Sequence, residues 1–412
     1  MIENIKNTVR SELFIGSLIL MILVNIGNII NYIFHFSMVK LLGPVDYGIF
    51  AVLTNIIYIF SVPALSIQTL VSKHTTKYNI NKEYGKIKGI LISLVREALI
   101  ISLIIYFIFL GTAFLIYEKL GIPFLLLALT GIFLFEAFIY PIITGILQGM
   151  KKFNVWGGNY LILCLFKFLI AITLVILGFK LYGAVLGFLL GTLISFFLVF
   201  FFIKEITNSR VIKENINIFS KQSSLIFFII LIVVLMYSID VILAKIFFEA
   251  EIAGKYAIAS LIGKIILFGT SVIGSAMFPI SSEKYEIGEK TRGVIKKTFF
   301  AVLLICFSAL LILGIFPELL INILFGKGYL SITGILIYVG IGFSFLSFLN
   351  IFILYKISIG KIRFKHIIIL AMFLIFQILI MSYFNSNLES FSIAFMVSTI
   401  IIFIASIVFI RR

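Results

Sequence analysis

The chain has 412 residues, of which 62% are hydrophobic and 12% are charged, and its formal net charge is +16 at pH 7. A soluble domain of this size cannot bury so much apolar surface, so the composition excludes a soluble protein and indicates one that crosses a membrane several times. In such a chain the bases belong to loops that face an anionic membrane surface, and nucleic-acid binding is not expected.

Apolar stretches recur along the whole chain. A stretch of about 20 residues crosses about 30 Å of hydrocarbon as a helix. A helix is expected because an open strand edge has no hydrogen-bond partner in lipid. The sequence therefore predicts an all-α membrane protein with twelve transmembrane helices. Their expected limits are 13–39, 47–72, 89–117, 121–148, 154–178, 181–203, 222–247, 254–281, 297–317, 329–355, 365–384 and 391–410.

Basic residues in the connections indicate the orientation. With the N-terminus on the inner side, 24 Lys and Arg residues fall in inner segments and six in outer segments. Because basic residues favour the cytoplasmic side, we expect a multi-pass protein of the plasma (inner) membrane with both termini in the cytoplasm.

The connections and motifs argue against an enzyme. Membrane glycosyltransferases usually place catalytic groups in large outer loops, and every outer connection here is short. The sequence holds no Gly-rich phosphate loop, catalytic triad or metal-ligand cluster, so we expect no catalytic residue, metal or cofactor. Cys164 and Cys306 both lie within apolar stretches, which makes a disulfide framework implausible.

The two halves of the chain resemble each other at an offset of 206 residues. Residues 41–52 read LLGPVDYGIFAV and residues 247–258 read FFEAEIAGKYAI, so that Gly48 superposes on Gly254. Each segment joins the first and second helices of a six-helix half. Transporters use such repeats to build a binding site between two lobes. We therefore expect a six-helix lobe at 1–204, a cytoplasmic linker at 205–221 and a second six-helix lobe at 222–412.

Six ionisable side chains lie within the predicted helices, where each is costly and is by default a candidate functional residue. Counted at 1.5 Å per residue, four fall in the middle third of the membrane and two lie nearer the inner face. The four are Glu136, Lys167, Asp240 and Lys264, and the two are Arg96 and Glu97.

Two interpretations of these charges stay open. In the structural one, salt bridges join Glu136 to Lys167 and Asp240 to Lys264 and hold neighbouring helices together. In the functional one, the same side chains line a water-filled cavity in which the two lysines attract an anionic substrate. Both hold at once if a bridge exchanges partners during transport.

The first predicted helix carries a polar stripe. Asn25, Asn28, Asn31 and His35 occupy an arc of about 120° on one face. Such side chains either hydrogen-bond between helices or face a cavity. His35 lies close to the expected outer surface, where it either senses pH or is simply solvated or packed.

Three segments carry a family resemblance. They are KLLGPVDYGIFAV at 40–52, the run that starts at Asp240-Val-Ile-Leu-Ala-Lys and continues as AGKYAIAS at 253–260, and MFPISSE at 277–283. The first resembles the first outer turn, and the others the seventh and eighth helices, of the Wzx-type polysaccharide flippases that export O-antigen and repeat units.

This resemblance implies the fold of the multidrug/oligosaccharidyl-lipid/polysaccharide exporter superfamily, two six-helix bundles in a MATE-like V that work by alternating access. It implies an oligosaccharide on a polyprenyl phosphate or pyrophosphate, moved to the outer leaflet for polysaccharide or envelope biosynthesis. The partners expected are this substrate, membrane lipids, H⁺ or Na⁺ and polysaccharide-assembly proteins. The candidate substrate-binding residues are Lys167, Lys264, Arg96, Asn28 and Asn31, and the candidate coupling or conformational residues are Asp240, Glu136 and His35.

Two other functions stay open. One is a cation-coupled antiporter of drugs or metabolites in the same superfamily, in which Asp240 and Glu136 bind H⁺ or Na⁺. The other is a non-transporting membrane subunit of an envelope-assembly complex. Drug sensitivity after deletion, with normal surface glycans, would favour the first of these.

Overall fold

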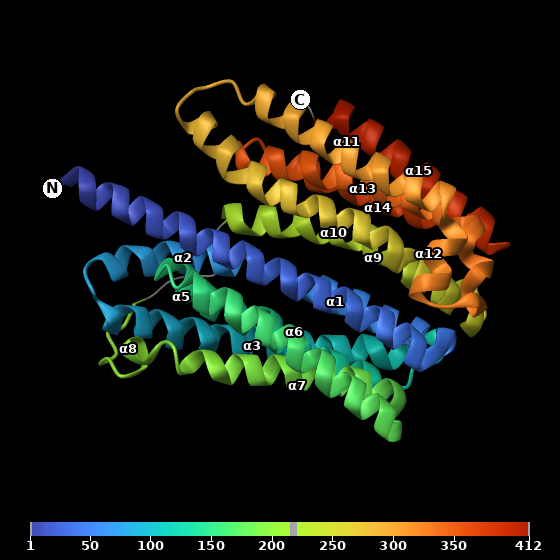
Figure 1. Ribbon diagram of the computed structural model, residues 1–412, viewed down its shortest axis with the longest axis horizontal. Coiled ribbons are helices and arrows are strands. Elements are labelled where there is room, and N and C mark those ends of the chain that lie inside the picture. Colours follow the sequence, from blue (N-terminus) through green and yellow to red (C-terminus); the bar gives the residue numbers. More distant parts are fainter. Residues whose placement is uncertain (1, 215–220, 411–412) are drawn as a thin grey trace. The chain divides into compact units, whose positions relative to one another are not determined.

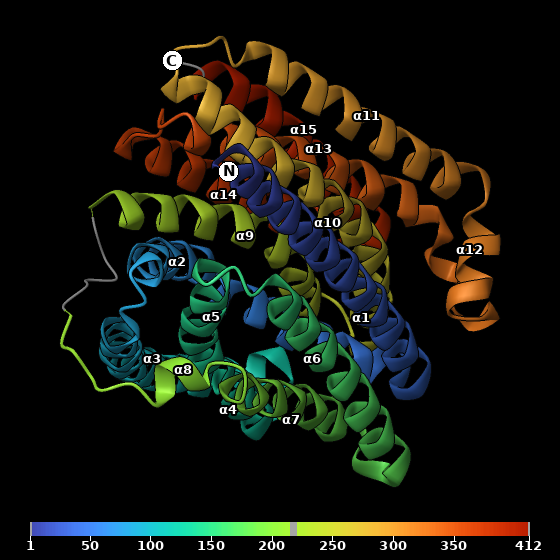
Figure 2. The ribbon, with the colours of Figure 1, turned by 60° about the vertical axis from the view of Figure 1, so that its left-hand side comes forward.

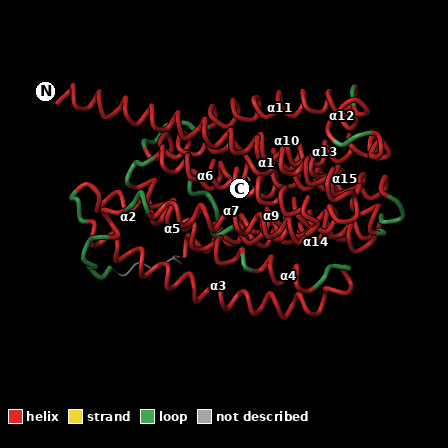
Figure 3. The backbone as a smooth tube through the Cα atoms, turned by 60° about the horizontal axis from the view of Figure 1, so that its bottom comes forward, coloured by secondary structure: helices red, strands yellow, loops and turns green. Residues whose placement is uncertain are grey.

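The computed structural model describes residues 2–214 and 221–410, and every regular element in this part of the chain is a helix (Figure 3). Of residues 2–15, 17, 65 and 221–223 only the backbone is described. Residues 215–220 of the expected linker lie outside the described residues, as do Met1, Arg411 and Arg412.

The chain divides into two compact units. Unit 1 contains Met1–Leu42 and Phe60–Ser220, and unit 2 contains Gly43–Ile59 and Lys221–Arg412. Residues 43–59 thus pack with unit 2, although the sequence repeat assigns them to the first lobe. The lobe boundaries expected at 1–204 and 222–412 stay a prediction.

Unit 1 holds the helices from the N-terminus to the linker, coloured blue to green in Figure 1. They are α1 (Ile2–Phe60, whose last part belongs to unit 2), α2 (Ala64–Ile80), α3 (Tyr84–Leu120), α4 (Phe124–Gly131), α5 (Phe133–Gly149), α6 (Phe153–Leu174), the π-helical η1 (Val175–Phe179), α7 (Lys180–Phe200) and α8 (Lys204–Thr207).

Unit 2 holds the remaining helices, coloured yellow-green to red in Figure 1. They are α9 (Lys221–Phe247), α10 (Ala250–Glu286), α11 (Arg292–Ile315), α12 (Pro317–Leu324), the 3₁₀-helical η2 (Lys327–Ile332), α13 (Thr333–Ser358), α14 (Phe364–Tyr383) and α15 (Leu388–Phe409).

Ten helical stretches of the described chain are long and apolar enough to cross a membrane. Two of them, Leu18–Phe60 and Phe153–Phe200, have 43 and 48 residues, about twice what one crossing needs. Each is interrupted by a glycine with positive φ, Gly43 at 73° and Gly178 at 95°. Because only glycine adopts this conformation without strain, each break makes two spans of one stretch. The predicted all-α, twelve-span membrane architecture is confirmed.

Close helix packing positions the side chains discussed below. In unit 1, α6 lies along α7 (Figure 2). Gly187 and Gly191 bring the α7 backbone against Ala171 and Lys167 of α6. In unit 2, α13 contacts both α10 and α15, and its Phe343 packs against Phe395 of α15 with the rings tilted and their centroids 5.1 Å apart. Both arrangements hold a lysine-bearing helix rigidly against its neighbour.

The two glycines that the repeat superposes lie against each other. A Cβ placed on Gly48 would lie 2.8 Å from the Cα of Gly254, and a Cβ on Gly254 would overlap the carbonyl oxygen of Pro44. Only glycine therefore lets α10 approach residues 43–59 this closely. The contact gives a physical reason for both glycines in the two repeat motifs.

Candidate functional site

A buried lysine is the centre of a polar cluster in unit 1, formed by α1, α5, α6 and α7. Lys167 on α6 is 3% exposed, and its amine donates a hydrogen bond to Asn31 Oδ1 on α1. The amine also lies 4.7 Å from the ring centroid of Phe34 and 4.3 Å from that of Phe188. Aromatic faces stabilise a cation in apolar surroundings. Lys167 is thus held by neutral groups.

The polar stripe of the first helix joins the same cluster. Tyr160 on α6 donates a hydrogen bond to Asn28 Oδ1 at 2.8 Å, and Asn31 Nδ2 donates to the Tyr160 hydroxyl at 3.3 Å. Asn25 instead donates to the carbonyl of Met21 in its own helix. The expected hydrogen bonding between helices is therefore present at Asn28 and Asn31.

The expected ion pair between Glu136 and Lys167 is not formed. Glu136 on α5 interacts with Thr192 of α7 and electrostatically with Lys167, and the ion pairs among the described residues do not include Glu136 with Lys167. The physical reason is competition, because the Lys167 amine is already engaged by Asn31 and two aromatic rings. This part of the structural interpretation is wrong.

A second buried cluster in unit 2 surrounds Asp240 and Lys264. Asp240 on α9 is fully buried and Lys264 on α10 is 4% exposed. Asp240 Oδ1 lies 3.7 Å from the Lys264 amine, which confirms the expected ion pair. Ser260 and Tyr256 donate hydrogen bonds to Asp240 Oδ2 at 2.6 and 3.5 Å.

The lysine of this pair has another strong partner. Lys264 donates a hydrogen bond to Asn55 Oδ1 at 2.6 Å, and Asn55 is 3% exposed. Asp240 Oδ1 accepts no hydrogen bond from the described residues, and its 3.7 Å distance to the Lys264 amine is too long for one. A lysine amine has three donors, so Lys264 can serve the amide, the carboxylate and a further acceptor.

Two further candidate residues are Arg96 and His35. Arg96 is exposed on α3 and forms no ion pair among the described residues. His35 is 8% exposed and its ring lies edge-on to Phe34, with centroids 5.3 Å apart. His35 is thus packed behind the ring that contacts Lys167, which matches the packing alternative for this histidine.

Sequence reasoning missed Asn55, Tyr160 and Ser260. Asn55 lies in the second predicted helix, 209 residues from the lysine that it contacts, and no local pattern links them. Ser260 closes the AGKYAIAS motif, so its position in a family signature was an available signal. Tyr160 lies one helical turn before Cys164 and two before Lys167, on the same face of α6.

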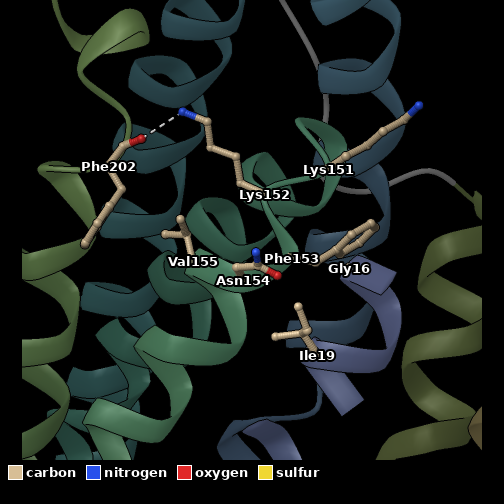
Figure 4. A pocket seen from close by; sticks show the side chains of 8 residues that line it. All are labelled: Gly16, Ile19, Lys151, Lys152, Phe153, Asn154, Val155 and Phe202. Atoms are coloured by element: carbon tan, nitrogen blue, oxygen red, sulfur yellow. Dashed lines mark hydrogen bonds between the residues drawn. The ribbon is translucent and has the colours of Figure 1, made fainter. Parts of the chain in front are cut away.

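Each unit also has a surface groove whose lining includes none of the cluster residues named above. The groove in unit 1 has a volume of about 520 Å³, and Figure 4 shows Lys152, Phe153 and Ile19 on its walls. Lys152 is engaged there by the Phe202 carbonyl at 3.0 Å and by Glu205 at 2.9 Å. The groove in unit 2 has a volume of about 510 Å³ and is lined by α10 and α11. Among the described residues, no group of His, Cys, Asp or Glu side chains forms a metal site.

Solved structures share the fold over nearly the whole chain. An inward-facing multidrug resistance transporter of the MATE family and MOP superfamily is 13% identical, with a TM-score of 0.73 and coverage of 93% of this chain and 94% of that one. The lipid II flippase MurJ in an inward closed conformation is 15% identical, with a TM-score of 0.66 and coverage of 96% and 88%. A MATE transporter of Vibrio cholerae is 15% identical, with a TM-score of 0.62 and coverage of 98% and 97%.

These structural similarities establish the MATE-type fold, and a match to a family model establishes the family to which the chain belongs. No curated protein matches the sequence. The model of the polysaccharide biosynthesis protein family matches residues 37–334, which include Asn55, Lys167, Asp240 and Lys264. The resemblance noted in the sequence is confirmed, and the chain belongs to the polysaccharide biosynthesis protein family.

Proposed function

We propose that this multi-pass membrane protein flips an oligosaccharide linked to a polyprenyl phosphate or pyrophosphate from the inner to the outer leaflet. The observation that carries the proposal is the buried Lys167, whose contacts with Asn31, Phe34 and Phe188 are all neutral. No carboxylate of the described residues forms an ion pair with Lys167, and a buried cation of this kind retains its attraction for a phosphate. Family membership and a lipid II flippase of the same fold support this reading.

The proposed binding residues act by charge and by hydrogen bonding. Lys167 and Lys264 each supply an ammonium group that offsets the dehydration of a phosphate. Asn28 and Asn31 hold Lys167 and Tyr160 in place and offer amide groups to sugar hydroxyls. Arg96, being exposed on α3, attracts the anionic head group before it enters.

The proposed coupling residues are Asp240, Glu136 and His35. Asp240 shares Lys264 with Asn55, so a phosphate that engages Lys264 shifts the lysine away from the carboxylate. The freed carboxylate then takes up H⁺ or Na⁺, and this exchange biases an alternating-access equilibrium. The membrane potential acting on the charged head group is a second energy source.

A cation-coupled antiporter of drugs or metabolites is the alternative that a specific observation favours. Glu136 interacts with Thr192 and forms no ion pair within the described part of the chain, an arrangement that can hold a proton or Na⁺ on the carboxylate. MATE multidrug transporters share the fold. A non-transporting subunit of a polysaccharide-assembly complex is the remaining candidate, and assembly proteins are proposed partners in every case.

Deletion and complementation in the native host separate these functions. Cells without the protein should accumulate lipid-linked oligosaccharide on the inner side of the plasma membrane, and the wild-type gene should clear it. Lys167→Met should fail to clear it, and Lys119→Met, which alters an exposed base on α3, should succeed. Drug sensitivity with normal glycans would instead identify the antiporter. A defect in assembly with unchanged lipid-linked sugar on both sides would identify the subunit.

The orientation is part of the proposal. The excess of basic residues in alternate connections supports a cytoplasmic location for both termini in the plasma membrane. A reporter that is active only in the cytoplasm should be active when fused to the C-terminus, and one that is active only outside the cytoplasm should be inactive there. The opposite result would contradict the proposed topology.

A further inference from the structure

The groove in unit 2 combines an apolar wall with a basic rim. It runs between the last third of α10 and the first turns of α11 and has a volume of about 510 Å³. Ile273, Met277 and Ile280 supply apolar wall from α10, and Ala301 continues it on α11. The basic residues Lys284, Lys290 and Lys297 line the same groove.

Two of the three lysines form no ion pair with any residue that the structure describes. Lys284 is 2.5 Å from Glu289 Oε2 and is neutralised by it. Lys290 and Lys297 are exposed and form no ion pair among the described residues. Their side chains therefore offer two free ammonium groups at one end of an apolar groove, a combination that attracts an anion.

The first turn of α11 adds to this attraction. Gly293 and Val294 belong to this turn and line the groove. The N-terminus of a helix carries a partial positive charge and backbone N–H groups that point outward. A Cβ at Gly293 would meet no atom within 4 Å, so the backbone there is open to a ligand. The helix end and the lysines thus act on the same side of the groove.

The apolar wall indicates which anion fits. Inorganic phosphate gains nothing from Ile273, Met277 and Ile280, whereas a hydrocarbon chain does. These side chains lie on α10, which is long and apolar enough to cross a membrane. The apolar wall of the groove is therefore at the depth that lipid acyl chains occupy. A phospholipid places its phosphate at the rim and its chains along this wall.

We propose that the α10–α11 groove binds an anionic phospholipid of the membrane as a resident ligand. Lys290 and Lys297 hold its head group, and Ile273, Met277 and Ile280 contact one acyl chain. None of these residues belongs to the Lys167 or Lys264 cluster, so the site is separate from the proposed cargo contacts. It goes beyond the proposed transport function and does not depend on it.

Native mass spectrometry of the purified full chain in detergent, titrated with phosphatidylglycerol and with phosphatidylcholine, tests this site. We expect one preferred phosphatidylglycerol adduct in the wild type, and at least tenfold weaker binding of it in Lys290→Gln/Lys297→Gln. The control Lys213→Gln/Lys296→Gln removes two exposed bases that do not line the groove and should bind as the wild type does. If both double variants lost phosphatidylglycerol binding equally, the loss would be due to the lower net charge of the protein and not to the groove. That result would overturn the proposal.

A second variant tests the apolar wall without changing charge. Ala276 lines the groove and is exposed, so Ala276→Phe fills the space while leaving the core of unit 2 intact. We expect it to weaken phosphatidylglycerol binding about tenfold, and millimolar inorganic phosphate not to displace the lipid from the wild type. Unchanged binding in Ala276→Phe, with displacement by phosphate, would show a free-anion site. Displacement by an equimolar polyprenyl diphosphate would show a cargo site, and either result would overturn the proposal.

Discussion

The Lys264 amine donates a hydrogen bond to Asn55 Oδ1 at 2.6 Å and lies 3.7 Å from Asp240 Oδ1. The lysine is therefore closer to a neutral amide than to its only direct carboxylate partner among the described residues. Asp240 is anchored on its other oxygen by Ser260 at 2.6 Å. The carboxylate is thus held in place, whereas the Lys264 amine has two acceptors within reach. A lysine that exchanges partners during transport requires such a second acceptor.

Removing the charge of Asp240 alone should be severe. Asp240→Asn leaves the buried Lys264 ammonium without a counter-charge, which costs about 3–5 kcal/mol of stability. The double variant Asp240→Asn/Lys264→Met removes both charges and should recover most of that loss. Thermal unfolding in detergent measures both. Glu251→Gln, which breaks the surface pair with Lys255, should cost at most about 1 kcal/mol. A double variant as unstable as Asp240→Asn would contradict the buried-pair account.

The aromatic contacts of Lys167 should matter for binding. Phe188→Leu removes the nearer ring, 4.3 Å from the amine, and a cation–π contact contributes about 0.5–2 kcal/mol. We expect a several-fold rise in the transport KM and a lower unfolding temperature. Phe166→Leu changes an exposed ring one residue before Lys167 on the same helix and serves as the control. Identical KM values for the two variants would show that the ring does not support the lysine.

The glycine contact between the repeats should not tolerate a methyl group. Gly254→Ala pushes a Cβ into the carbonyl oxygen of Pro44, and overpacking of this kind costs about 1–3 kcal/mol. Gly269→Ala lies on the same helix with no atom within 4 Å of its Cβ, and should be neutral or slightly stabilising. Unfolding temperatures compare the two. Equal behaviour would mean that α10 does not depend on close approach at Gly254.

Two glycines at the start of α3 hold the described part of the linker. A Cβ on Gly85 would overlap the Arg210 carbonyl oxygen and one on Gly89 the Ile212 carbonyl oxygen. Ile212 also donates a backbone hydrogen bond to the Gly85 carbonyl at 3.0 Å, and Lys88 donates to the Ser209 carbonyl at 3.0 Å. The described part of the linker is thus hydrogen-bonded to α3 beside the two positions where glycine leaves room for its backbone.

A bulky residue at Gly89 should therefore detach this segment. Gly89→Leu is expected to increase tryptic cleavage after Arg210 and Lys213 by tenfold or more, because the displaced chain fits a protease cleft. Gly111→Leu lies on the same helix in open space and should leave the cleavage rate unchanged. If both variants were cleaved at the wild-type rate, the attachment would not protect the linker.

The helices could be predicted because their signal is local. Runs of about 20 apolar residues mark each span; the break at Gly43 falls in a predicted connection, and the break at Gly178 falls at the predicted end of a span. The pair Asp240–Lys264 could be predicted because both charges lie at similar depth in adjacent helices. Asn55 could not, since its contact with Lys264 depends on how residues 43–59 pack on α10.

The pairing of Glu136 with Lys167 failed for a related reason. Depth and charge make the two side chains compatible, but they do not reveal that Asn31, Phe34 and Phe188 surround the same amine. An amide and two rings compete with a carboxylate for a lysine only when three helices meet around it. Sequence spacing within one helix predicts that Asn28 and Asn31 share a face, and it does not predict their partner.

Transport by the purified protein in proteoliposomes is the most direct measurement of the central claim. A lipid-linked oligosaccharide is supplied in one leaflet, and the appearance of its sugar in the other is followed with an impermeant modifying reagent. The account predicts movement above the protein-free rate with the wild type, and a loss of at least tenfold in Lys167→Met with normal folding. Movement at the protein-free rate with the wild type, or an undiminished rate in Lys167→Met, would contradict it.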